Sequence, residues 1–171
     1  MIRSCSLRRC LLLGSLLLAA TALPAVAQLQ SSPTLGSPTS IVEGVLLPDE
    51  AFALSGFVEA DGHIALVWEL PPQGYYLYRK SLSVELPDGT VLEGYDVPQG
   101  VMVEDEFFGE SEVYFERLLV RLPLREVPES AFTRTSDGAR ELELLVSYQG
   151  CAQDKYCYPQ QHTALTLELP E

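Results

Sequence analysis

The sequence ELELLVSYQGCAQDKYCYPQQHTALTLEL, residues 141–169, contains two alternating apolar runs on either side of a cysteine pair. Apolar or aromatic side chains occupy every second position of both runs: Leu142, Leu144, Val146 and Tyr148 before the cysteines, and Leu165, Leu167 and Leu169 after them. A period of two puts such side chains on one face of a β-strand. The stretch therefore predicts two half-buried strands, at residues 141–149 and 163–169, joined through the cysteine segment.

The upstream sequence continues the period of two. Further extended runs occupy residues 63–70, 75–86 and 113–122, and turn sequences rich in Pro, Asp and Gly separate them. Residues 125–140 are more polar and are expected to form a long connection. No stretch shows the pattern of an amphipathic helix. About seven to nine short strands in one domain predict an all-β fold, an antiparallel β-sandwich.

The first residues have the features of an export signal. Three arginines precede an apolar run at residues 11–22, and Ala25-Val26-Ala27 supply the small side chains that a signal peptidase requires. Residues 1–27 are therefore predicted to be a signal peptide that is cleaved after Ala27. No later stretch approaches the ~20 apolar residues that a membrane span needs, so we expect no membrane insertion of the mature chain.

The remaining chain divides into an arm and one domain. Residues 28–40 combine Ser-Pro pairs with few apolar side chains, which predicts a flexible N-terminal arm. Residues 41–171 are long enough to form one domain with its own core. The predicted cleavage would also remove Cys5 and Cys10.

The charge of the chain is strongly negative. The full sequence has 24 Asp and Glu against 11 Lys and Arg, and the predicted cleavage would remove three of the arginines and no acid. Such a surface repels nucleic acid and anionic lipid, which excludes both as partners. It suits a soluble protein that meets other proteins transiently, and transient exchange favours a monomer.

Cys151 and Cys157 form a Cys-x5-Cys pair that closes only a small ring. A loop of about seven residues stabilises a fold by roughly 2 kcal/mol in the chain-entropy model, less than a longer loop does. Because small exported domains use bridges freely, the residues alone favour a structural disulfide and leave a redox-active one open. A metal site with His63 and His162 is disfavoured, because the spacing fits no common zinc pattern and an oxidising compartment works against free thiolates. No bound metal or cofactor is expected.

Four segments, in this order, resemble a known family. They are LPDEAF at 47–52, GYYLYRK at 74–80, EDEFFGESEVY at 104–114 and YQGCAQDKYCYP at 148–159. Together they are similar to the N-terminal periplasmic domain of the DsbD thiol:disulfide interchange family of protein-disulfide reductases. The resemblance extends from about Leu46 to the C-terminus and favours the redox role of the cysteine pair.

The resemblance implies an immunoglobulin-like sandwich with the cysteine loop at one end. It implies a periplasmic relay that takes two electrons from a thioredoxin-like partner or a membrane donor and needs no cofactor, because the disulfide is the redox group. The recipients in the family are oxidised periplasmic proteins: disulfide isomerases and a thioredoxin-like protein of cytochrome c maturation. By resemblance, Cys157 would form mixed disulfides with partners and Cys151 would resolve them.

The resemblance also implies a cap loop next to the disulfide. The loop consists of Asp105, Glu106, Phe107, Phe108 and Gly109, with Phe107 over the disulfide until a partner displaces it. Among the acids of residues 104–116, a direct role is assigned to Asp105 and Glu106 alone. The others are expected to form a solvated face: Glu104, Glu110, Glu112 and Glu116. The residues by themselves favour buried aromatics of a turn for the two phenylalanines, and the resemblance reverses that preference.

Tyr76 and Tyr78 alternate on one strand face and are explained either as sandwich core or, by resemblance, as neighbours of the disulfide. The full family protein continues into a membrane-embedded domain and a thioredoxin-like domain. The present sequence ends at Glu171, so we expect either a free-standing version or a fragment of a longer product. The rival hypothesis is a binding or assembly module of the same fold with a structural disulfide.

Overall fold

The computed structural model describes residues 44–72 and 74–170, and within them the strands form antiparallel sheets. One sheet contains β1 (Ala53–Val58), β2 (His63–Glu69) and β7 (Arg117–Pro123). A second contains β12 (Gln161–Leu169), β9 (Arg140–Tyr148) and β4 (Ser83–Glu85), with β8 (Phe132–Arg134) also paired to β9. A third has the order β11 (Tyr156–Cys157), β10 (Gly150–Ala152), β3 (Tyr75–Tyr78), β6 (Gly109–Phe115) and β5 (Val101–Asp105). The predicted all-β antiparallel fold is confirmed.

Helical structure in the described residues is limited to short turns. They are α1 (Pro48–Ala51) and the 3-10 turns η1 (Arg79–Ser81), η2 (Leu124–Glu126) and η3 (Glu129–Ala131). No helix in this part of the chain is long and apolar enough to cross a membrane. The predicted signal peptide, residues 1–27, and the predicted arm, residues 28–40, lie outside the described residues.

The main core lies between the β1–β2–β7 sheet and the β12–β9–β4 sheet. Paired positions of β2 and β7 supply fully or almost fully buried side chains: Ile64 with Leu122, Leu66 with Val120, and Trp68 with Leu118. The alternating side chains of β9 meet them in the same cluster: Leu142, Leu144 and Val146. Burying one such side chain contributes about 1.5–3 kcal/mol. The period of two in the sequence therefore marks the residues that hold the sandwich together.

Two of the predicted extended runs are each divided between two sheets. The run 75–86 becomes β3, the turn η1 and then β4, and the run 113–122 becomes β6 and β7 with Glu116 between them. Glu116 adopts a positive φ of 57°, which marks the point where the chain leaves one sheet for the other. The apolar alternation continues across both breaks, so it indicates strand structure without showing the change of sheet.

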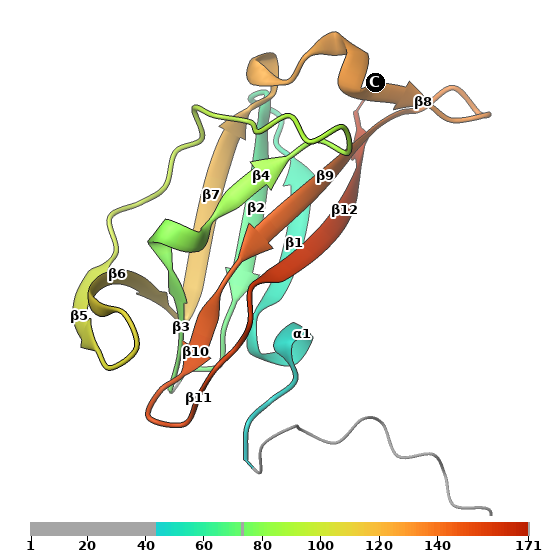
Figure 1. Cartoon of the computed structure of the whole chain (residues 1–171). Helices are drawn as coiled ribbons and strands as arrows, with labels where there is room; N and C mark the ends of the chain where they lie inside the picture. Colours follow the sequence, from blue (N-terminus) through green and yellow to red (C-terminus); the bar gives the residue numbers. More distant parts are fainter. Residues whose placement is uncertain (1–43, 73, 171) are drawn as a thin grey trace, which may run out of the picture. The chain divides into compact units, whose positions relative to one another are not determined.

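The structure also adds regular elements where the sequence predicted none. The polar connection 125–140 contains parts of η2 and β9 and the whole of η3 and β8. The cysteine segment is a short β-hairpin, β10–β11, instead of an irregular loop. Figure 1 shows this hairpin at the same end of the sandwich as the loop between β5 and β6, the predicted cap loop.

Candidate functional site

Cys151 and Cys157 form a disulfide across the β10–β11 hairpin. The two residues are direct partners in the antiparallel register, so the pairing of the strands brings their sulfur atoms together. The turn that joins the strands is closed by the Lys155 N–H, which donates to the Ala152 carbonyl at 3.1 Å, and Asp154 takes a positive φ of 57°. Cys151 is fully buried, whereas Cys157 is partly exposed.

Strand β3 presents its side chains alternately to two different cores. Tyr75 and Leu77 belong to the main core, whereas Tyr76 and Tyr78 belong to a second, smaller cluster that includes Cys151. Tyr76 is also the register partner of Cys151 in the β10–β3 pairing. Both tyrosines are buried, but next to the disulfide and not in the main sandwich core.

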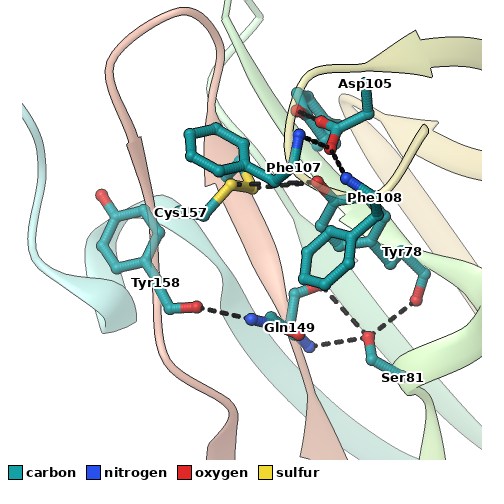
Figure 2. Close-up of a disulfide and its surroundings, with 10 residues drawn as sticks. Tyr78, Ser81, Asp105, Phe107, Phe108, Gln149, Cys157 and Tyr158 are labelled. Atoms are coloured by element: carbon teal, nitrogen blue, oxygen red, sulfur yellow. Dashed lines mark hydrogen bonds between the residues drawn. A yellow bond between two sulfur atoms is a disulfide. The ribbon is translucent and has the colours of Figure 1, made fainter. Parts of the chain in front are cut away.

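The hydroxyl of Tyr78 lies against both sulfur atoms of the disulfide. Its oxygen is 3.1 Å from Cys151 Sγ and 3.8 Å from Cys157 Sγ (Figure 2). Burial, together with hydrogen bonds to Tyr76 and Asp105, raises the pKa of Tyr78 above its ordinary value. Tyr78 therefore remains a neutral phenol at neutral pH, available to donate a hydrogen bond to sulfur.

Asp105 connects the second cluster to the cap loop. The Tyr76 hydroxyl donates to Asp105 Oδ2, and the backbone N–H groups of Phe107 and Phe108 donate to Asp105 Oδ1 at 2.9 Å and 2.8 Å. Burial raises the pKa of Asp105, but these hydrogen bonds and one from Tyr78 outweigh it, so the pKa lies below its usual value. Burial and the contact with this carboxylate raise the pKa of Tyr76 to about 12.

The two phenylalanines of the cap loop are exposed. Phe107 keeps 53% of its surface and Phe108 keeps 43%, which excludes the interpretation of both as buried aromatics of a turn. The Phe108 ring stands edge-on to the Tyr78 ring, with centroids 5.0 Å apart and an interplanar angle of 81°. In the view of Figure 2 the Phe107 ring projects across the sulfur atoms. Gly109 closes the loop with φ +67°, a conformation that side chains with a Cβ rarely adopt.

A cavity of about 160 Å³ opens beside Tyr76. Four acids line it: Glu104, Asp105, Glu106 and Asp154. The rest of its lining consists of Tyr76, Val103, Phe115 and Gln153. Asp105 is the buried member of this set, whereas Glu106 is exposed. Across the described residues, no group of three or more His, Cys, Asp or Glu is arranged to hold a metal ion.

Comparison with known proteins assigns the chain to a family. The family model for the thiol:disulfide interchange protein DsbD, N-terminal, matches residues 43–169. The chain belongs to the DsbD N-terminal domain family.

Curated DsbD proteins and solved DsbD domains agree with this assignment. DsbD of Photorhabdus laumondii is 39% identical over 111 residues, which cover 65% of this chain and 17% of that protein. DsbD of Escherichia coli K12 is 34% identical over 119 residues, which cover 70% of this chain and 19% of that protein. The match thus spans less than one fifth of the length of these curated relatives.

Two solved structures from Neisseria meningitidis match the chain. The reduced DsbD N-terminal domain matches with a TM-score of 0.58 and 26% identity, over 74% of this chain and 92% of that one. The DsbD N-terminal domain in complex with the PilB N-terminal domain matches with a TM-score of 0.54 and 27% identity, over 72% and 87%. The predicted immunoglobulin-like fold is confirmed by these likenesses.

A hydrogen-bond network that was not predicted from the sequence joins the end of β3 to the start of the cysteine hairpin. Ser81 Oγ donates to the Tyr78 carbonyl and accepts from the Gln149 N–H, both at 2.9 Å, and the Tyr78 N–H donates to the Gln149 carbonyl at 2.9 Å. The Gln149 side chain donates to the Tyr158 carbonyl at 2.9 Å (Figure 2). The Tyr-Gln-Gly-Cys motif therefore includes a residue, Gln149, that ties the hairpin to β3.

Gly150 of the same motif is required by close packing. A Cβ atom there would lie 2.4 Å from the Tyr76 carbonyl oxygen and 2.6 Å from the ring of Phe52. Because β10 approaches both β3 and Phe52, the residue directly after α1, this closely, no side chain fits between the strand and the aromatic ring. The disulfide is thus attached to a tightly packed pair of strands, β10 and β3.

Proposed function

We propose that this chain relays two electrons by thiol:disulfide interchange through the Cys151–Cys157 disulfide. The observation that carries the proposal is the unequal burial of the two cysteines: Cys151 has no exposed surface, whereas Cys157 is partly exposed. Exchange requires one sulfur that a partner reaches and a second that stays close enough to resolve the intermediate. Membership of the DsbD N-terminal domain family supports the same activity.

The proposed reaction begins at the exposed sulfur. A thiolate of the electron donor attacks Cys157 Sγ, a mixed disulfide forms, and Cys151 leaves as a thiolate. The Tyr78 hydroxyl, 3.1 Å from Cys151 Sγ, is placed to donate a hydrogen bond to that developing charge. A second thiolate of the donor then attacks its own sulfur in the mixed disulfide and releases Cys157. The donor has then lost two electrons, and the reduced cysteine pair, after taking up two protons, holds them.

Delivery is the same sequence in reverse. The Cys157 thiolate attacks the disulfide of an oxidised protein, and Cys151 then attacks Cys157 Sγ, which restores the internal disulfide and releases the reduced product. We propose a thioredoxin-like donor, or a membrane protein that carries one, and oxidised periplasmic acceptors such as disulfide isomerases and cytochrome c maturation factors. The complex of a related DsbD N-terminal domain with the PilB N-terminal domain supports exchange by direct domain docking.

The proposed location is the periplasm, after removal of the signal peptide. The cap loop of residues 105–109 is proposed to shield the disulfide, with Phe107 over the sulfur atoms, until a partner displaces it. Asp105 and Glu106 are the two acids of this loop, and Asp105 holds the loop in place by accepting from the Phe107 and Phe108 N–H groups.

Partner trapping tests the order of attack. With Cys151→Ala, the remaining Cys157 should accumulate mixed disulfides with a thioredoxin-like protein, measured by non-reducing electrophoresis and mass spectrometry. Cys157→Ala is the matched control, and its buried Cys151 should accumulate few. Equal trapping by both variants would contradict the assignment of Cys157 as the attacked sulfur.

Reducibility tests the relay itself. The oxidised domain should exchange two electrons with a reduced thioredoxin-like protein at comparable potentials, read by mass after alkylation. A structural disulfide, as the binding-module hypothesis requires, has a potential below about −300 mV and would survive that incubation. Survival would contradict the proposed function.

A further inference from the structure

The cap loop contacts side chains of the β3–η1 segment at two residues: Asp105, which accepts from the Tyr76 hydroxyl, and Phe108. The Phe108 ring stands edge-on to Tyr78 at 5.0 Å, and the Lys80 ammonium lies 3.9 Å from its centroid. The same ammonium is 5.4 Å from the centroid of Tyr78. The aromatic ring of the loop therefore contacts a cation and a phenol that come from one short segment of chain.

Hydrogen bonds of its neighbour fix the backbone around Lys80. Lys80 lies in η1, directly after β3, and its neighbour Ser81 bonds to both the Tyr78 and the Gln149 backbone. Tyr78 in turn contacts Cys151 Sγ at 3.1 Å. The lysine and the phenol that hold Phe108 are thus fixed to the same strand that contacts the disulfide.

The two phenylalanines of the cap loop are held differently. The Phe108 ring contacts the Tyr78 ring and the Lys80 ammonium. Phe107 is 53% exposed, and the anchor that the structure gives it is its backbone N–H on Asp105. A side chain that shields the disulfide and a side chain that anchors the loop are therefore separate residues.

We propose that Lys80 is a positioning residue for thiol:disulfide interchange, because its ammonium holds the cap loop closed through the ring of Phe108. We call Lys80, Phe108 and Tyr78 the Phe108 latch. The inference deepens the proposed function and rests on it, since a closed loop matters only if the disulfide reacts. A cation over an aromatic face at an exposed site is a weak attraction, equivalent to a factor of about two to five in the open–closed equilibrium. Such a latch keeps small thiols out and still yields to a docked partner.

The test is the rate at which excess dithiothreitol reduces the oxidised protein at pH 7. The dithiol is oxidised to its cyclic disulfide while the cysteine pair gains two electrons and two protons. Lys80→Met, which keeps a long apolar side chain without the charge, should be reduced about two- to fivefold faster than the wild type. Lys80→Arg keeps a cation and should react at the wild-type rate.

The direction of the effect separates the latch from general electrostatics. Loss of a positive charge near the disulfide would by itself slow attack by an anionic thiolate, so a faster reaction requires an opened loop. Lys155→Met is the matched control: Lys155 is an exposed residue of the cysteine hairpin turn, with Nζ 3.4 Å from the Gly44 carbonyl oxygen. It should not accelerate reduction. In a Phe108→Leu background, Lys80→Met should have no further effect, because the ring that the ammonium binds is gone.

The outcomes distinguish the latch from the relay. Equal rates for the wild type and Lys80→Met would overturn the latch and leave the relay intact. A disulfide that resists the dithiol in every variant would overturn the proposed function. Proton NMR tests the latch independently of reactivity: the Lys80 ε-methylene protons should be shifted upfield in the wild type, mainly by the nearer Phe108 ring, and clearly less in Phe108→Leu. Unshifted protons in the wild type would overturn it.

Discussion

Replacing Asp105 with Asn tests whether one buried carboxylate connects the cap loop to the disulfide cluster. Asp105 is 7% exposed and accepts hydrogen bonds from the Tyr76 hydroxyl and from the N–H groups of Phe107 and Phe108. Asn keeps the size of the side chain and an acceptor oxygen but removes the charge. The substitution therefore measures what the charge contributes to this junction.

The expected loss of unfolding free energy depends on which hydrogen-bond donors to Asp105 can bond to water instead. Phe107 and Phe108 are exposed, so solvent compensates for much of any weakening of their N–H bonds. The Tyr76 side chain is buried, so solvent compensates less for a weaker bond from its hydroxyl. A hydrogen bond to a charged group contributes about 1.5–3 kcal/mol and is roughly twice as strong as a neutral one. Asp105→Asn should therefore lower the free energy of unfolding by about 1–2 kcal/mol at pH 7.

The pH dependence has a definite sign. The folded pKa of Asp105 lies below its ordinary value, so its charge stabilises the folded protein fully above the unfolded pKa of about 3.9. That stabilisation is lost as the pH falls from there through the folded pKa. The difference between wild type and Asp105→Asn should consequently be constant from pH 7 to 5 and shrink below about pH 4.

Urea denaturation of the oxidised protein measures both effects. With a slope of about 2 kcal/mol per molar, the midpoint should fall by roughly 0.5–1 M at pH 7. Glu110→Gln removes the same charge from an exposed residue at the other side of the loop and should leave the midpoint unchanged. An unchanged midpoint for Asp105→Asn, or a difference that persists undiminished at pH 2, would refute the reasoning.

Two further substitutions test the surroundings of the disulfide. Tyr78→Phe removes the hydroxyl 3.1 Å from Cys151 Sγ, so the leaving thiolate loses its hydrogen-bond donor. Reduction by a thioredoxin-like protein, measured by stopped flow, should slow about tenfold. Tyr95→Phe loses a hydrogen bond to the Leu82 carbonyl instead and should be reduced at the wild-type rate. Gly150→Ala places a Cβ 2.4 Å from the Tyr76 carbonyl oxygen and should lower the urea midpoint strongly or prevent folding. At Gly62 nothing lies within 4 Å of a Cβ, so Gly62→Ala should lower the midpoint only through the strain of its positive φ. Similar midpoints for the two variants would contradict the packing argument.

The alternation of apolar and polar residues predicted the strands of the fold but not their division between sheets. The every-second-residue pattern of residues 141–149 corresponds to β9, and the one at 63–70 to β2. The pattern does not change where a strand passes from one sheet to another, so Glu116, at the break between β6 and β7, gave no signal. Its positive φ is imposed by the sheet crossing and not by a residue type that favours that conformation.

The site shows the same limit at the level of single side chains. Tyr76 and Tyr78 were placed beside the disulfide by resemblance, and the structure puts them there, while the roles assigned to the cap loop remain predictions. Lys80 and Gln149 lie within the segments that carried the resemblance and Ser81 directly follows one of them, but the sequence assigned no role to any of the three. What makes them important is contact across a long separation in the sequence. Ser81 and Gln149 are 68 residues apart, and their bond exists only once β3 and β10 have paired.

The resulting arrangement explains how an acidic domain without a helix N-terminus at its cysteines could control a disulfide. Tyr78 and Asp105 supply to one small cluster a neutral donor at the sulfur atoms and an ionised acceptor at the loop. Both states are maintained at neutral pH, because burial keeps the phenol protonated and the donated hydrogen bonds keep the carboxylate charged. A partner that opens the cap loop must therefore break the contacts of Phe108 and strain those of Asp105 together. Access to the sulfur atoms and the geometry of their hydrogen-bond donor are coupled through Tyr78, which contacts both Phe108 and Cys151.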